Sequence, residues 1–446
     1  MKALALVVVA AACAADPAGD DDPEPVFTDE DRAALAELHY GAAAPADPSN
    51  AYVAMPAAQR LGQRLFFATE LSGPLIDRDN DGTTGTLGAI GDTGKIACAS
   101  CHVPEAGFVD TRSPHRQISL AAKWTARRSP TLLDVAASPM FNWDGRRDTL
   151  WNQALGVMEA VGEFNASRLF VAQQMFRFHR ADYEALFGAM PPLEDARFPQ
   201  LAPATAGCDA AIGGAGEVCR GKPGTAEYDA MSVADRDAVT RVAVNTAKAI
   251  AAYVTQLRCG PSRFDAWLDG DTSALTRSEQ RGAALFVGRA GCATCHSGPQ
   301  LTDGAFHNVG LRPSTVATAF TDTDDRGAAV GLASAHGDPL GAAGVYSDGP
   351  RGTLPAVVAT HEGAFKTPTL RCIANQPSFM HTAQIRTLAS VVEFFDRGGD
   401  QVGFPGTNEL STIGPLGLSE RDRADLVAFM GALQGPGADA ALLAAP

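Results

Sequence analysis

Two pentapeptides in the sequence each combine two cysteines with a histidine at one fixed spacing. They lie at 98–102 (C-A-S-C-H) and at 292–296 (C-A-T-C-H). Two thiols one helical turn apart can bond the two vinyl groups of one haem, and the adjacent imidazole can ligate its iron as proximal ligand. We therefore expect two covalently attached c-type haems. The competing interpretation is a pair of zinc or redox C-x-x-C sites with unrelated histidines. The residues expected to bind the haems are Cys98, Cys101, His102, Cys292, Cys295 and His296.

Length and charge are compatible with an electron-transfer protein. The chain has 446 residues, of which 46% are apolar, so two haem domains with extensions fit within it. A net charge of -15 argues against nucleic acid or an anionic membrane surface as partner. It suits docking with a small basic electron-transfer protein, although an acidic surface also serves solubility.

The N-terminus has the pattern of an export signal. A charged start precedes an apolar run over 4–12, which predicts a signal over residues 1–15. Cys13 would suit a lipid anchor to the outer membrane, but Ala10 stands where a lipobox usually has leucine, so ordinary cleavage near Ala15 is the alternative. Either route predicts a periplasmic protein. No later stretch has the length and apolarity of a transmembrane helix.

The remaining cysteines fit an oxidising compartment. Once Cys13 and the four motif cysteines are set aside, four are left, and an even number in an exported protein favours two disulfides. Cys208 with Cys219 would close a Gly-rich loop, and Cys259 with Cys372 would join two distant segments. The sequence alone does not fix this connectivity.

Apolar residues recur with helical spacing in many segments, while strand signals are weak, so the class is mainly α. The second haem motif is expected to be followed by a long, mostly irregular loop over 302–368. Asn165 is expected to cap one long helix to Gly188. The other expected helices span 29–41, 56–69, 149–160, 233–257, 387–396 and 419–433.

This organisation predicts two cytochrome c-type haem domains with long irregular loops. After the signal, residues 16–50 form an acidic tether and helix. The first haem domain spans 51–260 and includes a Pro- and Gly-rich excursion over 191–225. The second haem domain spans 276–436.

The acidic stretch 77–82 (D-R-D-N-D-G) matches the start of an EF-hand calcium loop. Position twelve of that loop is Gly88, where the bidentate glutamate belongs. This missing ligand favours a solvated acidic turn over the alternative, a local calcium site.

Four further runs accompany the haem motifs: R-L-F-F at 64–67, S-P-T-L-L at 129–133, W-D-G-R at 143–146 and K-T-P-T-L-R at 366–371. With them, the chain resembles the bacterial diheme cytochrome c peroxidase family, including its MauG-type branch, from about Leu61 to Leu433. The resemblance implies that Trp143 lies between the haems and that Gln153 and Glu163 line the distal pocket of the peroxide-binding haem. A partly desolvated carboxylate is suited to take a proton from one peroxide oxygen and return it to the other.

The chain departs from the family pattern at both distal positions. Ala122 stands where activatable peroxidases carry a removable histidine, and His115 is out of register, so the first haem is expected to be open to peroxide. At the second haem, Phe395 stands where the peroxidases have methionine and the MauG branch has tyrosine. Phenylalanine cannot ligate iron, so this haem is five-coordinate or takes a substitute ligand such as Met380 or His307.

The family's structural calcium uses an asparagine just before the S-P-T run, and Arg128 occupies that position. A guanidinium could replace the charge of the cation, so we expect no calcium there.

The leading hypothesis is a peroxidase that reduces hydrogen peroxide with electrons from a small cytochrome c or cupredoxin. One alternative is a MauG-like enzyme that oxidises residues of a partner protein, which the missing methionine favours. A non-catalytic diheme electron carrier is the other, and Glu163 argues against it.

Overall fold

A computed structural model describes residues 25–41, 46–112, 118–209, 218–312, 325–400 and 413–446. The predicted signal and Cys13 lie outside the described residues. The α-helices are α1 (Asp29–Glu37), α2 (Pro56–Phe67), α3 (Cys98–Cys101), α4 (Leu150–Glu159), α5 (Arg168–Phe178), α6 (Arg180–Phe187), α7 (Ala226–Asp229), α8 (Val233–Val254), α9 (Arg263–Leu268), α10 (Arg277–Val287), α11 (Ala328–His336), α12 (Leu388–Asp396) and α13 (Glu420–Ala432).

Short 3-10 helices and one strand pair complete the described structure. The 3-10 helices are η1 (Pro104–Ala106), η2 (Val135–Ala137), η3 (Pro203–Thr205), η4 (Cys292–Thr294), η5 (Ala359–His361) and η6 (Ala440–Leu442). Strands β1 (Phe306–His307) and β2 (Phe365–Lys366) pair antiparallel, with Phe306 opposite Lys366. The mainly α class is confirmed.

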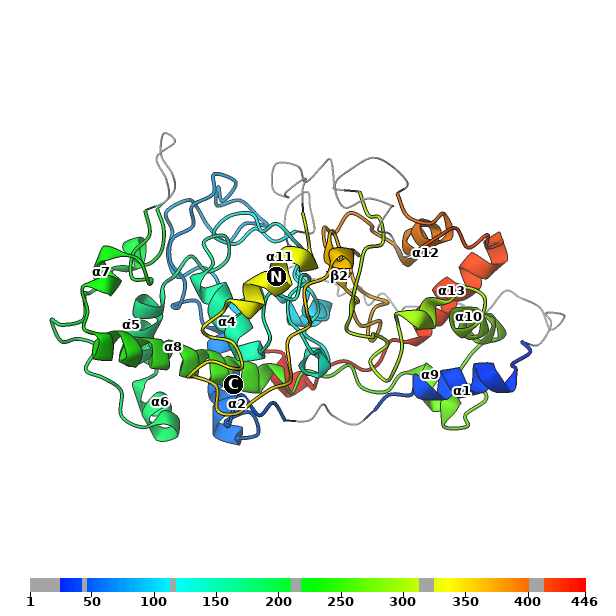
Figure 1. Ribbon diagram of the computed structural model, residues 1–446, viewed down its shortest axis with the longest axis horizontal. Coiled ribbons are helices and arrows are strands. Elements are labelled where there is room, and N and C mark those ends of the chain that lie inside the picture. Colours follow the sequence, from blue (N-terminus) through cyan, green and yellow to red (C-terminus); the bar gives the residue numbers. More distant parts are fainter. Residues whose placement is uncertain (1–24, 42–45, 113–117, 210–217, 313–324, 401–412) are drawn as a thin grey trace, which may run out of the picture.

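One group of helices packs around α8, which is in contact with α2, α4 and α5 (Figure 1). Ser232 caps α8 by accepting a hydrogen bond from the backbone N–H of Asp235. Gly62 lets α2 approach very closely, because a Cβ there would lie 1.8 Å from the carbonyl oxygen of Ala249 on α8. No larger residue fits at this crossing.

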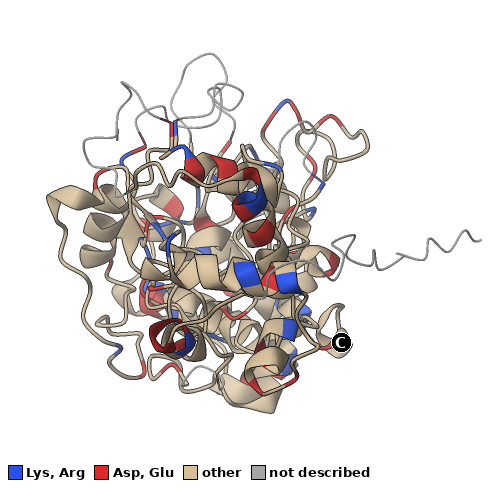
Figure 2. Ribbon diagram, turned by 90° about the vertical axis from the view of Figure 1, so that its right-hand side faces the viewer, with Lys and Arg blue, Asp and Glu red and all other residues tan. Residues whose placement is uncertain are grey.

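A second group repeats the arrangement around α10 and α13. A Cβ at Gly282 on α10 would lie 2.0 Å from the carbonyl oxygen of Asp425 on α13. Four positions after each crossing glycine comes a buried phenylalanine, Phe66 in α2 and Phe286 in α10. The helix before each haem motif therefore crosses a later helix in the same way. On this side of the molecule the helices carry acidic and basic residues together (Figure 2).

Each end of the chain packs on the half of the molecule that the other end builds. Leu35 of α1 is buried in the core of the α10–α13 group, beside α9 and α10 in Figure 1. At the other end, Gln63 donates from Nε2 to the carbonyl oxygen of Ala441 at 2.7 Å, and the Tyr253 hydroxyl donates to that of Leu442 at 2.6 Å. Contacts near both ends of the described chain therefore hold the two helix groups together.

Both predicted disulfides are confirmed. Cys208 bonds Cys219, and Cys259 bonds Cys372 across 113 positions of sequence. The second bridge joins the segment after α8 to the segment after the K-T-P-T-L-R run.

The single helix predicted from Asn165 to Gly188 is wrong, because it is two helices that meet at His179. Ser167, not Asn165, caps α5, and Asn165 instead donates from Nδ2 to the carbonyl oxygens of Pro74 and Cys208. The Nε2 of His179 lies 2.7 Å from a carboxylate oxygen of Glu70. This contact between distant residues stabilises the boundary between α5 and α6, and it is not visible in the hydrophobic periodicity of the sequence.

The region 302–368 carries more structure than expected, since β1, α11, η5 and β2 all lie within it. Among the described helices, none is both long and apolar enough to cross a bilayer.

Candidate functional site

The first motif lies on the wall of a cavity of about 450 Å³. Cys98 and Cys101 begin and end α3, and His102 follows directly. The His102 Nδ1 lies 2.9 Å from the carbonyl oxygen of Phe108. Because a carbonyl only accepts, Nδ1 carries the proton and the lone pair is on Nε2, the form that ligates iron. Burial lowers the pKa of His102, which keeps the imidazole neutral.

The second motif repeats this geometry on the wall of a cavity of about 820 Å³. Its first three residues form η4, and the His296 Nδ1 lies 2.9 Å from the carbonyl oxygen of Leu301. Burial again lowers the pKa of the histidine. Both volumes fall in the range of about 300–1,000 Å³ that is usual for ligand and cofactor sites.

The four motif cysteines are free thiols, whereas the other four described cysteines are disulfide-bonded. Burial raises the pKa of Cys98, Cys101 and Cys292 to about 12. Two thiols and a neutral imidazole beside each cavity fit the covalent attachment of one haem.

Polar side chains line the same cavity as the first motif. Gln153 on α4 and Glu163, four residues past its end, both line the smaller cavity with Arg146. Burial raises the pKa of Glu163, although the charges of Arg146 and Arg147 act in the opposite direction. A carboxyl with a raised pKa in a cavity is suited to exchange protons with a bound substrate.

Ala122 contacts the backbone of Glu163. The backbone N–H of Ala122 donates to the carbonyl oxygen of Glu163 at 3.0 Å. Of the described residues that line the smaller cavity, His102 is the one histidine. His115 lies outside the described residues. The described lining of this cavity thus contains no second imidazole.

Trp143 lines both cavities. Its indole Nε1 donates to the carbonyl oxygen of Arg128 at 2.8 Å, and its own carbonyl oxygen accepts from the backbone N–H of Lys366 at 2.7 Å. Two residues on, Gly145 has φ +71°, and a Cβ there would collide with the ring of Phe306. The W-D-G-R run thus needs its glycine, and its tryptophan forms part of the wall between the cavities.

The larger cavity is lined by Phe395, Met380 and His307. The thioethers of Met140 and Met430 line it too, so Met380 is one of three sulfur candidates for the iron. Of these three methionines, only Met380 was predicted from the sequence as a substitute ligand, beside His307.

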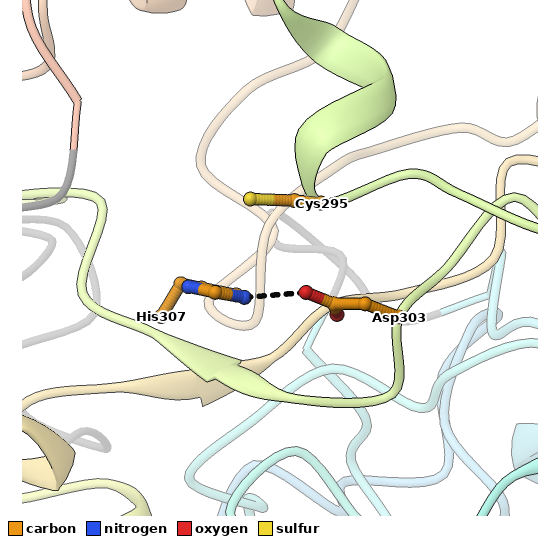
Figure 3. Close-up of side chains that lie close together, drawn as sticks. All are labelled: Cys295, Asp303 and His307. Carbon is orange, nitrogen blue, oxygen red and sulfur yellow. Dashed lines mark hydrogen bonds and ion pairs between the residues drawn. The ribbon is translucent and has the colours of Figure 1, made fainter. Parts of the chain in front are cut away.

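His307 is engaged by neighbouring residues. Its Nε2 lies 2.7 Å from Asp303 Oδ2, and the Cys295 sulfur belongs to the same cluster, with all three donor atoms within 4.8 Å of one another (Figure 3). The Cys295 sulfur and the Asp303 carboxylate raise the pKa of His307 to about 9. These donors match a zinc-type set, but they include a sulfur that the second haem requires, so the two uses exclude each other.

Comparisons with known proteins identify the family. Residues 56–207 match the sequence model of the di-haem cytochrome c peroxidase family. The chain is 28% identical over 376 residues to the methylamine utilization protein MauG of Methylorubrum extorquens, which covers 84% of this chain and 77% of that protein. It is also 28% identical over 379 residues to a cytochrome-c peroxidase of Denitromonas iodatirespirans, with 84% and 80% covered. These matches support the di-haem cytochrome c peroxidase and MauG family for this chain.

Solved structures agree in fold. The diheme peroxidase BthA from Burkholderia thailandensis superimposes with a TM-score of 0.60 at 21% identity, covering 93% of this chain and 94% of that one. A MauG-like protein associated with microbial copper homeostasis gives 0.58 at 22% identity, covering 91% and 96%. Both likenesses support the cytochrome c-type arrangement.

A member of the di-haem peroxidase and MauG family is an oxidoreductase that carries two covalently bound c-type haems. This chain offers two matching sets of thiols and imidazole, each beside a cavity. The relatives include both peroxidases and MauG, so the family leaves open whether the oxidised partner is a small redox protein or a protein substrate.

The two positions discussed for calcium have protein partners. In the acidic stretch, Asp79 accepts from Trp124 Nε1 at 2.8 Å and Asp81 accepts from the backbone N–H of Thr83 at 2.9 Å. At the position of the family asparagine, Arg128 donates to Gln376.

Sequence reasoning missed an aromatic contact beside Trp143. The rings of His381 and Phe365 stack with centroids 3.6 Å apart, and His381 lies 6.4 Å from the Trp143 ring. Burial lowers the pKa of His381 to about 3, so it is neutral. No local signal marks this contact, because the partners are 16 and 238 positions away in sequence.

Proposed function

We propose that this chain is a periplasmic di-haem peroxidase that reduces hydrogen peroxide to two waters with electrons from a small cytochrome c or cupredoxin. The reaction consumes two electrons and two protons for each peroxide. The site therefore needs a proton carrier beside the peroxide and an electron route to it. The observation that supports this function is that Glu163 lines the smaller cavity while Trp143 lines both.

Each motif would hold one haem. Cys98 and Cys101 would form the thioethers at the smaller cavity with His102 as proximal ligand, and the second motif would do the same at the larger cavity. When bound, a haem iron with an open position supplies one-electron redox chemistry and a site for peroxide.

Glu163 would move the proton. Its carboxylate takes the proton from the inner peroxide oxygen and delivers it to the outer one, so that the outer oxygen leaves as water. A pKa raised by burial brings the carboxyl closer to neutral pH, where it can both accept and donate. Gln153 lines the same cavity and would orient the peroxide by hydrogen bonding.

Trp143 would provide the electron route. Its indole lies in the wall between the cavities, held by the Arg128 carbonyl oxygen, so electrons entering at the second haem reach the first through it.

The two helix groups would be the two haem domains, 51–260 and 276–436, with 191–225 as an excursion from the first. The buried cores support this division, since Phe66 and Trp151 belong to one cluster and Phe286 and Phe429 to another. The acidic segment 16–50 would combine a tether with the helix α1, and the protein would be either free in the periplasm or anchored by a lipid on Cys13.

Phe395 favours a second candidate, a MauG-like enzyme that oxidises residues of a partner protein. A methionine ligand raises haem potential and suits electron entry from a cytochrome, and Phe395 removes it from the family position. The same two haems would then withdraw electrons from a protein docked outside.

Electron paramagnetic resonance of the isolated diferric protein, before and after one equivalent of peroxide, tests these proposals. A peroxide-sensitive high-spin signal with a persistent low-spin signal, together with peroxide turnover on a reduced cytochrome, supports the peroxidase. Two high-spin signals that both vanish, without turnover on small donors, support the MauG-like enzyme. Spectra that do not change when peroxide is added would contradict both catalytic proposals and indicate an electron carrier.

A further inference from the structure

A buried cation without an acidic partner stands between the two cavities. Arg128 is 5% exposed and lines both cavities. Its guanidinium donates to the Gln376 side-chain oxygen and, at 3.4 Å, to the Ser378 hydroxyl, and its buried Nε has no partner within the described structure. Both partners are neutral. None of the described carboxylates forms an ion pair with this side chain.

Arg127, the neighbouring arginine, has acidic partners, in contrast to Arg128. Arg127 pairs with Asp144 at 2.7 Å and with Asp325 at 2.6 Å, so its charge is balanced within the chain. Burying an unpaired ion costs several kcal/mol, and burial alone lowers the pKa of Arg128 to about 10. A position this costly implies an anion that enters one or both cavities.

The haems themselves bring such anions. Every haem carries two propionate carboxylates, and a guanidinium offers five N–H donors in a planar fork that suits carboxylates. Lys366 is a second partly buried cation, but it lines only the larger cavity. The charge of Asp303 partly offsets the effect of burial on the pKa of Lys366, whereas none of the described carboxylates does so for Arg128.

We propose that Arg128 is a shared counter-charge whose guanidinium binds a propionate of each haem, so that one side chain sets the potentials of both. This inference rests on the proposed haem attachment. A cation beside a haem favours the reduced state, because reduction removes one positive charge. Lys366 would act on the second haem alone.

Spectroelectrochemical titration of the holoprotein tests the assignment with Arg128→Gln, Arg128→Lys and Lys366→Met. We expect Arg128→Gln to lower the reduced-to-oxidised ratio of both haems at fixed poise about threefold to tenfold, where tenfold is 59 mV for one electron. Arg128→Lys should retain most of the ratio, and Lys366→Met should change one haem only. Arg326→Gln is the matched control, because it removes one charge from an exposed pair with Glu362 and should shift neither haem.

A haemochrome count separates this inference from the function on which it rests. Fewer than two thioether-linked haems in the wild type would contradict the attachment itself. With two haems present, Arg128→Gln potentials equal to those of Arg326→Gln would overturn the counter-charge. A shift of equal size in Arg128→Lys would do so too, because the charge is retained there. If Arg128→Gln does not accumulate, the resonance Raman bands of the propionates in Arg128→Lys test the proposal instead. Loss of the guanidinium fork must alter these bands, so unchanged bands would overturn it.

Discussion

The indole N–H of Trp143 donates to the carbonyl oxygen of Arg128 at 2.8 Å, and both residues line both cavities. The backbone of Arg128, the proposed counter-charge, therefore fixes the indole of Trp143, the proposed electron relay. Because Arg128 itself donates its backbone N–H to the carbonyl oxygen of His381 at 2.8 Å, the wall is tied to the second half of the chain.

Trp143→Phe should slow the response of the second haem to peroxide by at least about tenfold, because phenylalanine is a poorer electron relay. It should also cost about 1–3 kcal/mol of stability, since a buried carbonyl loses its donor. Freeze-quench paramagnetic resonance and chemical denaturation measure the two effects. Trp151→Phe is the control: Trp151 is fully buried and donates to Ser49, but lines neither cavity. Equal responses in the two variants would remove Trp143 from the electron route.

Glu163→Gln should lower kcat/KM for peroxide by about 10²–10⁴, the usual contribution of a general acid–base group. Burial raises the pKa of Glu163, and the reaction begins with the carboxylate, so wild-type activity should fall as pH drops, with a midpoint above the ordinary carboxyl range. The variant should lack this acid limb. Steady-state pH profiles measure both. Glu105 is exposed on η1, and Glu105→Gln should keep the fall in activity at low pH. If Glu163→Gln kept this fall too, a group other than Glu163 would transfer the proton.

Phe395→Met should place a thioether where the family's peroxidases have one. We expect a new low-spin ferric signal and a higher potential for the second haem. Phe394→Met is a neighbouring control, because Phe394 is fully buried and does not line the cavity. A spectrum of Phe395→Met identical to wild type would mean that another group, such as Met380, already occupies the iron, and Met380→Leu would then remove the low-spin signal.

The disulfides should differ in their contribution to stability. The loop-entropy relation gives about 4–5 kcal/mol for the 113-residue separation of Cys259 and Cys372, and about 2–3 kcal/mol for the 11-residue separation of Cys208 and Cys219. Denaturant unfolding of the two double alanine variants compares them. A larger loss from the shorter loop would show that strain or packing outweighs chain entropy here.

Features that rest on local pattern could be predicted from the sequence. The haem motifs, α8 and the cap of α13 by Ser419 depend on residues a few positions apart, and so does the mainly α class. The break at His179, the placement of α1 and the lack of an acidic partner for Arg128 among the described residues depend on residues far away in sequence. Arg128 was recognised only as the wrong residue for calcium, because the absence of a carboxylate partner exists only in three dimensions.

The crossed packing of the chain ends imposes an order on folding. Leu35 is synthesised early, yet the core that buries it includes Phe429, and the carbonyl oxygens that meet Gln63 belong to the last residues of the chain. Contacts of such long sequence separation form late. Neither half can therefore reach its final packing until segments from both ends of the described chain are present.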